Sequence, residues 1–441
     1  MIVITVATCA PLYGDGMRTR LALAGTIVSA LILVACSGDD DDGVATSDEP
    51  TASSAAVADT ATPAATPTPL PTVDPEERQL RRLFAGWKTD PTTLTVPPNE
   101  ISQGCFAGRD CIPAIDAAGA VEIPGPGLTA VFLPVSEATF EANVPVAYLT
   151  VEGHTRGYPL SIMTFHEIVN DEINGVPVAA TFCPLCNTAL AFDRRAGGRI
   201  LDFGVSGNLR NSDLIMFDRQ TESWWQQFTG EAIAGEFAGT ELVTIAMSIL
   251  SFEDFANAFP EADIMGPPQG GYGSRYGVNP YAYYDRPGSR PFLFNGDLDD
   301  RLDALDRVVG LEFEDVTMAV PFSELSSTGV ANVAVGGRPI AVLWAAGTSS
   351  ALDSPSIAAG RDIGAAVAYD AVVDGQRLTF EVIEPGLYLD LETGTTWDLT
   401  GLATKGPLAR TRLAVAQHAN HFWFAWAAFY PETTVWEAAA A

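Results

Sequence analysis

The chain has 441 residues, of which 47% are hydrophobic, and this length predicts two or three domains with ample material for a packed core. Acidic residues outnumber basic residues by 55 to 24, which gives a net charge of −31. A surface of this charge repels phosphate backbones, so we expect no nucleic-acid partner.

The N-terminus has the pattern of an export signal. Arg18 and Arg20 supply positive charge before an apolar run, Leu21 to Val34, which is short and abruptly ended for a membrane span. We therefore predict a signal peptide over residues 1–35. Met17 lies directly before the positive residues, so we expect translation to begin there.

The apolar run ends in Leu-Val-Ala-Cys at 33–36, which fits a bacterial lipobox. In this interpretation the signal is cut before Cys36, and Cys36 carries the lipid. A plain transmembrane anchor and an ordinary secretory signal are the alternatives. Residues 36–75 are rich in Ala, Thr and Pro, which predicts a disordered tether. We expect the folded part to lie in the cell envelope, anchored by lipid to the membrane on the extracytoplasmic side of a bacterium.

Residues 76–130 are expected to hold one helix and then an irregular segment. Asp74 is a favourable N-cap, and Pro75 is favourable at the first helical position, with acidic residues following in the first turn. Cys105 and Cys111 are close enough in sequence to close a small loop. Because disulfides persist in exported proteins, we predict a disulfide between them, with a free or metal-bound pair as the alternative.

From Val144 onward, short apolar runs broken by Gly, Asn and Asp predict a β-rich fold. The predicted strands are 147–151, 178–182, 190–192, 200–205, 214–217 and 242–245. Two helices are predicted, at 161–171 and 252–259. The segment 267–304 is rich in Gly, Pro and Tyr and is expected to be a long functional or connecting loop. The predicted fold class is α+β, predominantly antiparallel β, with short helices.

The chain resembles itself at a shift of 162 positions. Nine residues match without a gap: Thr155, Pro159, Ser161, Asn170, Gly175, Pro177, Ala179, Ala189 and Leu190 fall on Thr317, Pro321, Ser323, Asn332, Gly337, Pro339, Ala341, Ala351 and Leu352. Later matches, with gaps, include Asp218, Thr221 and Trp225 on Asp390, Thr393 and Trp397. We interpret the chain as two tandem homologous β-rich units, barrel- or sandwich-like, at 131–266 and 305–441. Chance similarity of β-rich sequence is the alternative.

The second unit lacks the reactive residues of the first. His154, His166, Glu167, Cys183 and Cys186 correspond to Val316, Thr328, Gly329, Ala345 and Thr348. Random losses would be spread over all residue types, whereas these remove two of the chain's four histidines and two of its six cysteines together. We therefore predict one functional site in the first unit, with these five residues as candidates.

The motif Cys183-Pro184-Leu185-Cys186 carries the main chemistry. Its two-residue spacer lets the sulfurs form a dithiol/disulfide pair or hold one metal ion. His166 is the expected third ligand, with His154 as a fourth. Such a set suits a zinc ion, and two sulfurs with imidazole also suit copper. A metal site, a redox-active dithiol and an inert structural disulfide all remain open.

The chain is similar to a bacterial family catalogued as domain of unknown function 3179. The similarity is clearest in RGYPLSIMTFHEIVNDEINGVPVAATFCPLCNTALAFDR and LDFGVSGNLRNSDLIMFDRQTESWWQQFTGEAIAG, and it covers about 330 residues. The DCIPAID segment and the terminal HFWFAWAAFYPET run share it. The resemblance implies an exported protein and supplies no activity. The family's hallmark positions fall here on His166, Glu167, Asn170, Asp171, Cys183, Pro184 and Cys186.

Together these patterns predict an extracytoplasmic lipoprotein whose Cys/His site binds a metal or performs thiol redox chemistry. The alternative is a non-catalytic module of the cell envelope, for binding or for structure, in which Cys183 and Cys186 form a structural disulfide. The sequence does not decide whether the protein is an enzyme. The membrane, reached through the lipid anchor, is the one partner that it predicts.

Overall fold

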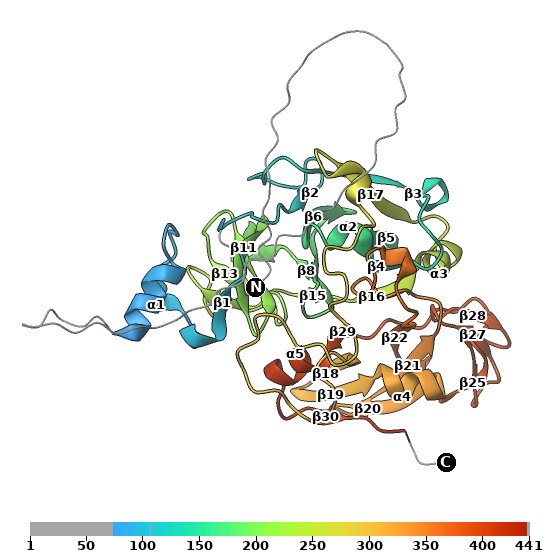
Figure 1. Ribbon diagram of the computed structural model, residues 1–441. Helices are drawn as coiled ribbons and strands as arrows, with labels where there is room; N and C mark the ends of the chain where they lie inside the picture. Colours follow the sequence, from blue (N-terminus) through green and yellow to red (C-terminus); the bar gives the residue numbers. More distant parts are fainter. Residues whose placement is uncertain (1–73, 106, 439–441) are drawn as a thin grey trace, which may run out of the picture. The chain divides into compact units, whose positions relative to one another are not determined.

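The structure is a computed structural model that describes residues 74–105 and 107–438 (Figure 1). The predicted signal peptide, the lipobox residue Cys36 and nearly all of the predicted tether lie outside the described residues. Within the described ranges, no helix combines the length and the apolar character that crossing a bilayer requires.

The first element is the predicted N-terminal helix, α1 (Pro75–Leu83). The Asp74 side chain caps it by accepting a hydrogen bond from Glu76 N at 2.9 Å, as the prediction required. Phe84 follows and stacks on Trp224, with ring centroids 4.2 Å apart, which ties the helix to the β-rich body. Short 3₁₀ helices occur at η1 (Pro91–Thr93), η2 (Pro98–Glu100), η3 (Val135–Glu137), η4 (Gly273–Arg275) and η5 (Ile357–Ala359).

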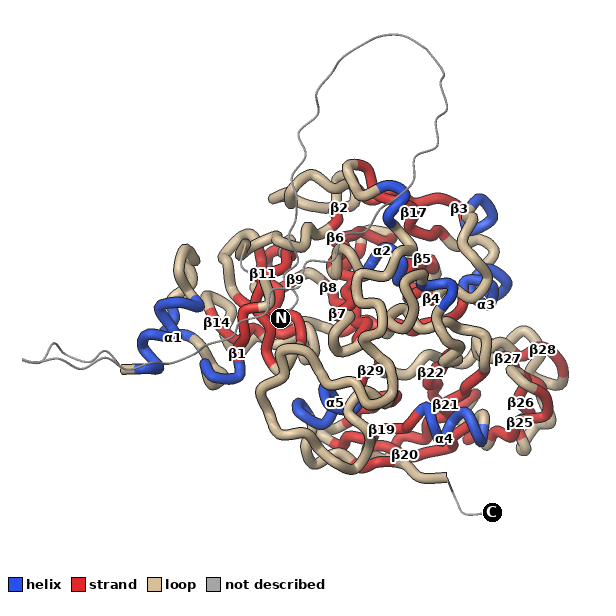
Figure 2. The backbone as a smooth tube through the Cα atoms, viewed as in Figure 1, coloured by secondary structure: helices blue, strands red, loops and turns tan. Residues whose placement is uncertain are grey.

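Strands far exceed helices in the rest of the described chain, with long loops between them (Figure 2), so the fold is mostly β with few short helices. The largest sheet has the strand order β15-β8-β7-β6-β2-β3-β17-β5-β4-β16. Its strands are β2 (Ile115–Asp116), β3 (Thr129–Pro134), β4 (Pro145–Val151), β5 (His154–Pro159), β6 (Ile168–Ile173), β7 (Val176–Cys183), β8 (Thr188–Asp193), β15 (Thr244–Ile245), β16 (Met247–Ser251) and β17 (Asp263–Gln269). The edge strand β16 also packs beside β8, so this sheet curls into a nearly closed barrel.

A second sheet contributes to the candidate site that is described below. It has the order β1-β11-β12-β13-β14 and is antiparallel throughout. Its strands are β1 (Ile101–Gln103), β11 (Phe203–Arg210), β12 (Asp213–Asp218), β13 (Trp224–Gln226) and β14 (Ala232–Ala234). A two-stranded ribbon, β9 (Arg195–Ala196) with β10 (Arg199–Ile200), lies between β8 and β11 in the chain.

The C-terminal strands form smaller sheets, with orders β29-β18-β19-β30, β20-β21-β22, β23-β24 and β25-β26-β27-β28. The first two contain β18 (Arg307–Phe313), β19 (Val316–Pro321), β20 (Val330–Val335), β21 (Arg338–Ala345), β22 (Ala365–Asp370), β29 (Ala419–Phe422) and β30 (Thr434–Val435). The others contain β23 (Val372–Val373), β24 (Gln376–Arg377), β25 (Phe380–Glu384), β26 (Leu387–Asp390), β27 (Thr396–Asp398) and β28 (Ala403–Lys405).

Strands β4 to β17 (145–269, the N-terminal half) and strands β18 to β30 (307–435, the C-terminal half) repeat one order of elements. The pairing β16-β4-β5-β17 recurs as β29-β18-β19-β30, and β6-β7-β8 recurs as β20-β21-β22. Side-chain contacts recur as well. Trp225 Nε1 donates to Asp218 Oδ2 at 2.9 Å, and Trp397 Nε1 donates to Asp390 Oδ2 at 2.8 Å. These are residues that the internal sequence similarity matched.

The helix predicted at 161–171 is wrong. Helix α2 (Leu160–Met163) makes one turn, and strand β6 then begins at Ile168. Glu167 has a left-handed backbone with φ of 60°, which ends helical geometry, and the β-branched Ile168 and Val169 pair with β7. Nearly every residue of β6 is buried, so its apolar residues do not alternate, and their spacing imitated that of a helix.

The other predicted helix is confirmed as α3 (Phe252–Ala258), which Ser251 caps by accepting a hydrogen bond from Asp254 N. The C-terminal half has α4 (Phe322–Thr328) and α5 (Trp423–Phe429) at the corresponding places in the chain. The main hydrophobic core spans both halves, because buried residues of β29 and α5 pack with those of β7 and β8.

Candidate metal centre

The two cysteines of the motif lie on one hairpin. Cys183 is the last residue of β7, and Cys186 lies in the turn that leads into β8. Cys183 pairs with Thr188 across the hairpin, and Asn187 helps to close the turn with a left-handed φ of 52°. Both cysteines are free thiols, with 2% and 0% of their surfaces exposed. The turn therefore keeps two thiols together and away from bulk water.

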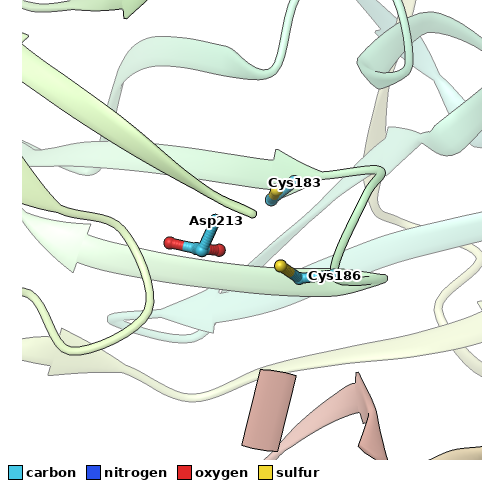
Figure 3. A group of neighbouring side chains, drawn as sticks. All are labelled: Cys183, Cys186 and Asp213. Carbon is cyan, nitrogen blue, oxygen red and sulfur yellow. The ribbon is translucent and has the colours of Figure 1, made fainter. Parts of the chain in front are cut away.

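Asp213 joins the two cysteines from the other sheet. It is the first residue of β12 and is fully buried. The two sulfurs and a carboxylate oxygen of Asp213 all lie within 4.8 Å of one another, and Figure 3 shows the three side chains around a common space. Cysteine and aspartate are both metal ligands in proteins. In the part of the chain that the structure describes, no other set of three Cys, His, Asp or Glu side chains is grouped this closely.

One oxygen of Asp213 has two N–H donors and the other has none. Oδ1 accepts hydrogen bonds from Gln226 Nε2 at 2.7 Å and from Phe228 N at 3.0 Å. Oδ2 is buried and receives no hydrogen bond from an N–H or O–H group of any described residue, which leaves the two thiols as its polar neighbours. Burial raises the pKa of Asp213 to about 7, although the hydrogen bonds from Gln226 and Phe228 and from the Cys183 and Cys186 thiols favour the charged form. Since a buried polar atom without a partner costs about 1–3 kcal/mol, this oxygen indicates a ligand.

The thiols are held in their protonated form. Burial raises the pKa of Cys183, and burial together with the neighbouring Cys183 and Asp213 raises the pKa of Cys186 well above its usual range. The Cys183 thiol accordingly donates a weak hydrogen bond to the carbonyl oxygen of Ser212, at 3.8 Å. Catalytic cysteines need the opposite shift, because the thiolate is the nucleophile. Without a cation nearby, this pair is poorly reactive.

Glu167 is a second buried acid beside the group. Its left-handed backbone lies between α2 and β6, and only 6% of its surface is exposed. Tyr281 OH donates a hydrogen bond to Glu167 Oε1 at 3.4 Å. Burial, with a contribution from the charge of Asp213, raises the pKa of Glu167 to about 8. The charge of Glu167 in turn raises the pKa of Cys183, so this carboxyl group lies within electrostatic reach of the three side chains.

The tyrosine-rich loop at 267–304 packs over the cysteine turn. Tyr284 OH donates to the carbonyl oxygen of Leu185 at 3.0 Å, and Phe292 N donates to Tyr284 OH at 3.3 Å. Ser212 Oγ donates to the carbonyl oxygen of Phe292, next to Asp213 in the chain. The loop is thus attached to both sides of the group, and it contributes to keeping the two thiols dry.

The predicted ligand His166 has other partners. Its Nδ1 lies 2.8 Å from the carbonyl oxygen of Pro113, its Nε2 lies 2.7 Å from Tyr276 OH, and its ring stacks on Tyr272. Both ring nitrogens are therefore engaged, and His166 is not part of the close group. His154 is not part of it either, because its Nε2 lies 3.0 Å from Asp263 Oδ2. The structure gathers Cys183, Cys186 and Asp213, with Glu167 beside them.

Asp213 is the site residue that sequence reasoning missed, although a signal existed. The match of Asp218 with Asp390 sets a shift of 172 positions in this region, and the same shift places Asp213 on Pro385. The C-terminal half therefore lacks the carboxylate as well as both thiols. A search for every acid lost between the halves would have included it.

The other predicted cysteine pair behaves as expected. Cys105 and Cys111 form a disulfide that closes a small loop after β1. The loop lies against β11, because Cys105 N donates to the carbonyl oxygen of Gly207 at 3.0 Å. This bridge is separate from the group of free thiols.

The family model described as protein of unknown function (DUF3179) matches residues 109–433. The chain belongs to the DUF3179 family. The resemblance seen in the sequence is thereby confirmed, and the DUF3179 match includes both halves and every residue of the Cys183–Cys186–Asp213 group. No curated protein and no solved structure is significantly similar to the chain.

Proposed function

We propose that this DUF3179 protein binds one zinc ion through Cys183, Cys186 and Asp213. The observation that carries the proposal is the close group of two free thiols and the buried Asp213, whose Oδ2 has no N–H or O–H donor among the described residues. A cation would give this oxygen a partner. It would also displace the thiol protons and stabilise the thiolates that burial otherwise disfavours.

The same surroundings argue against thiol–disulfide exchange as the main activity. Exchange needs a thiolate that a partner disulfide can approach, and it is fastest when the thiol pKa is near the ambient pH. Here burial raises the pKa of both thiols, and Cys186 is fully buried. Redox chemistry at Cys183 and Cys186 is therefore the second candidate, to be distinguished by experiment.

The ligand types favour zinc over copper. Zinc accepts thiolate, imidazole and carboxylate in a tetrahedral set, whereas soft thiolate and thioether ligands select monovalent copper. The carboxylate of Asp213 therefore suits zinc better. Three protein ligands leave one tetrahedral position, for which Glu167 and a water molecule are the candidates. Ligation by Glu167 would close the site and make it structural, whereas water would leave it open to catalysis.

We also propose that the two halves are tandem homologous units and that the site was lost from the second. The shared order of elements and the matched Trp–Asp contacts support this. Further support comes from the losses themselves, since Ala345, Thr348 and Pro385 stand where the three ligands would be. In this proposal the cell-envelope location follows from the predicted lipid on Cys36, which would hold the site on the extracytoplasmic side.

Metal analysis of the purified protein tests the zinc site. Wild type, prepared without chelators, is expected to contain one zinc per chain by mass spectrometry. Cys186→Ser and Asp213→Asn are expected to lose most of it. Thr348→Ser in the C-terminal half is the matched control for Cys186→Ser, and we expect it to keep the full content. Cobalt substitution should add thiolate-to-metal charge-transfer absorption that Cys186→Ser abolishes.

Each of the other possible results would support a different function for the site. A stoichiometric copper content that survives zinc competition would replace zinc by copper in the proposal. Absence of any stoichiometric metal, with a dithiol that mild oxidants close and mild reductants open, would establish the redox alternative. A Cys183–Cys186 disulfide that resists mild reductants in the purified protein would support the structural strut instead.

A further inference from the structure

A second site lies where the two halves meet, outside the metal centre. A cavity of about 240 Å³ is lined by residues of β8, the β13–β15 region, β18, β29 and α5. Two of its lining residues are the remaining histidines of the chain, His418 and His421, each with only 3% of its surface exposed. Neither histidine has a role in the proposed metal centre.

The hydrogen bonds fix which ring nitrogen of each histidine carries the proton. His418 Nδ1 lies 2.8 Å from the carbonyl oxygen of Ala416, which can only accept, so Nδ1 is the protonated nitrogen. Thr188 Oγ1 donates to the carbonyl oxygen of Cys186 at 3.2 Å and lies 2.8 Å from His421 Nδ1. With the hydroxyl proton directed to this carbonyl, we assign His421 Nδ1 as the donor to the hydroxyl oxygen. In both rings Nε2 is left with a lone pair.

These lone pairs are available to a ligand. His418 Nε2 has only Ser248 Oγ near it, at 3.5 Å, and His421 Nε2 has no hydrogen-bond partner among the described residues. His421 Cδ2, the ring carbon bonded to Nε2, lies beside Gly310, another lining residue, because a Cβ built on Gly310 would lie 2.8 Å from it. Burial lowers the pKa of His418 to about 4 and that of His421 to about 3, so both rings stay neutral acceptors at neutral pH.

The other lining groups select the charge of the ligand. Glu241 and Glu312 line the cavity and are exposed, and no lysine or arginine lines it. Tyr430 OH is already committed, since it donates to Glu312 Oε2 at 2.5 Å. Aromatic rings of Phe228 and Trp426 form part of the wall, and aromatic faces attract cations. Carboxylates, unprotonated imidazole nitrogens and aromatic rings together favour a positively charged donor of hydrogen bonds.

We propose that this cavity binds a small organic cation with N–H donors, of the primary ammonium or guanidinium class. A bare metal ion fits less well, because these histidines and glutamates do not form a group of three close ligand atoms, unlike the cysteine site. An anion would face two carboxylates without a counter-charge. The volume lies below the usual range of about 300–1,000 Å³ for sites that hold drug-sized ligands, so the ligand is small.

Calorimetric titration of the full chain with putrescine and with agmatine tests the proposal. Saturable binding is expected for at least one of them, and tetramethylammonium, which has the charge but no N–H group, is expected to bind at least about tenfold more weakly, since a charge-assisted hydrogen bond contributes about 1.5–3 kcal/mol. Glu241→Gln with Glu312→Gln should weaken binding by about tenfold or more. Glu314→Gln, an exposed acid that does not line the cavity, is the control and should leave it unchanged.

The imidazole contribution is tested by His421→Phe, which keeps a ring against Phe228 and removes the Nε2 acceptor. Binding should weaken about tenfold, and the circular dichroism spectrum reports whether the variant folds. If His421→Phe does not fold, the binding measured for the double variant Glu241→Gln with Glu312→Gln decides the test. Equal binding of tetramethylammonium, unchanged binding in the double glutamine variant, or no binding of either amine up to about 10 mM would overturn the proposal.

Discussion

Asn170 and Phe203 exchange two hydrogen bonds that join the barrel to the five-stranded sheet. Asn170 Nδ2 donates to the carbonyl oxygen of Phe203, and Phe203 N donates to Asn170 Oδ1, both at 2.8 Å. Asn332 and Phe380 repeat this exchange in the C-terminal half, with both distances at 2.9 Å. The two pairs differ in burial, because Asn170 is fully buried whereas Asn332 is exposed.

This difference predicts unequal costs for one substitution. Asn170→Ala should lower the free energy of unfolding by about 2–3 kcal/mol, because it leaves two buried main-chain groups unpaired. Asn332→Ala should cost about 1 kcal/mol or less, because water can replace the lost partners. Urea denaturation of both variants measures the two values. Equal losses of unfolding free energy in the two variants would contradict this prediction, because they would mean that water reaches the groups that Asn170 binds.

Zinc should stabilise the protein in proportion to its concentration. A ligand that binds only the folded state adds about 2.7 kcal/mol when its free concentration is 100 times the Kd. Thermal unfolding of metal-free wild type should therefore shift upward as zinc is added, and Asp213→Asn should lose most of that shift. Asp370→Asn, a substitution of a partly exposed acid in the C-terminal half, is the control and should respond as wild type does. A shift that persists in Asp213→Asn would assign zinc to other ligands.

Metal-free protein should become less stable between pH 6.5 and 8. Burial raises the pKa of Asp213 from 3.8 to about 7 and that of Glu167 from 4.5 to about 8. In this window the folded chain holds protons that the unfolded chain has released, so the free energy of unfolding falls as pH rises, by about 2 kcal/mol in total. The buried His418 and His421 have the opposite effect, but only below about pH 6.5, because their pKa values are lowered.

Urea denaturation at the two pH values, after chelator treatment and dialysis, measures this change. The double variant Asp213→Asn with Glu167→Gln cannot release these protons and should show a much flatter profile. Stability that rises with pH in metal-free wild type would show that both acids are ionised in the folded protein, contrary to their burial.

The Cys105–Cys111 bridge should contribute modestly. It closes a short loop, with a sequence separation of six residues, and the chain-entropy relation gives about 2 kcal/mol for such a loop. Replacing both cysteines by serine should lower the free energy of unfolding by up to this amount and leave the zinc content unchanged. A loss of zinc in this variant would contradict the prediction, because it would show that the disulfide affects the metal centre from which it is separate.

The proposed lipid anchor rests on one residue outside the described ranges. Cys36→Ser should prevent lipidation, so the protein should move from the membrane fraction to the soluble fraction of an expressing bacterium and should no longer incorporate labelled palmitate. An equal membrane content in the variant would favour a plain transmembrane anchor.

Local patterns predicted much of the fold. The strand expected at 178–182 is β7 (Val176–Cys183), and the one expected at 214–217 is β12 (Asp213–Asp218), because turn residues bound each apolar run. The helix at 161–171 failed because β6 is buried on both faces and offers no alternation. Closure of the barrel by β16 beside β8 involves residues far apart in sequence, so no local pattern could reveal it.

The site was predicted in part, for similar reasons. Two cysteines separated by two residues on a hairpin are near each other whatever the rest of the chain does. Asp213 reaches them from a different sheet, so its position depends on tertiary packing. His166 was expected on a helix and lies instead in a turn, where Pro113 and Tyr276 take both of its ring nitrogens. A tyrosine more than a hundred positions away cannot be assigned to a histidine by spacing.

The main-chain amide of Phe422 donates to the carbonyl oxygen of Cys186 at 2.8 Å. The C-terminal half, which lacks the candidate ligands, is thus bonded directly to the turn that carries the two cysteines. Any tightening of that turn would change the exchange rate and the chemical shift of the Phe422 amide. A nuclear spin in the C-terminal half would then report on metal occupancy at the cysteine turn, without a label on either cysteine.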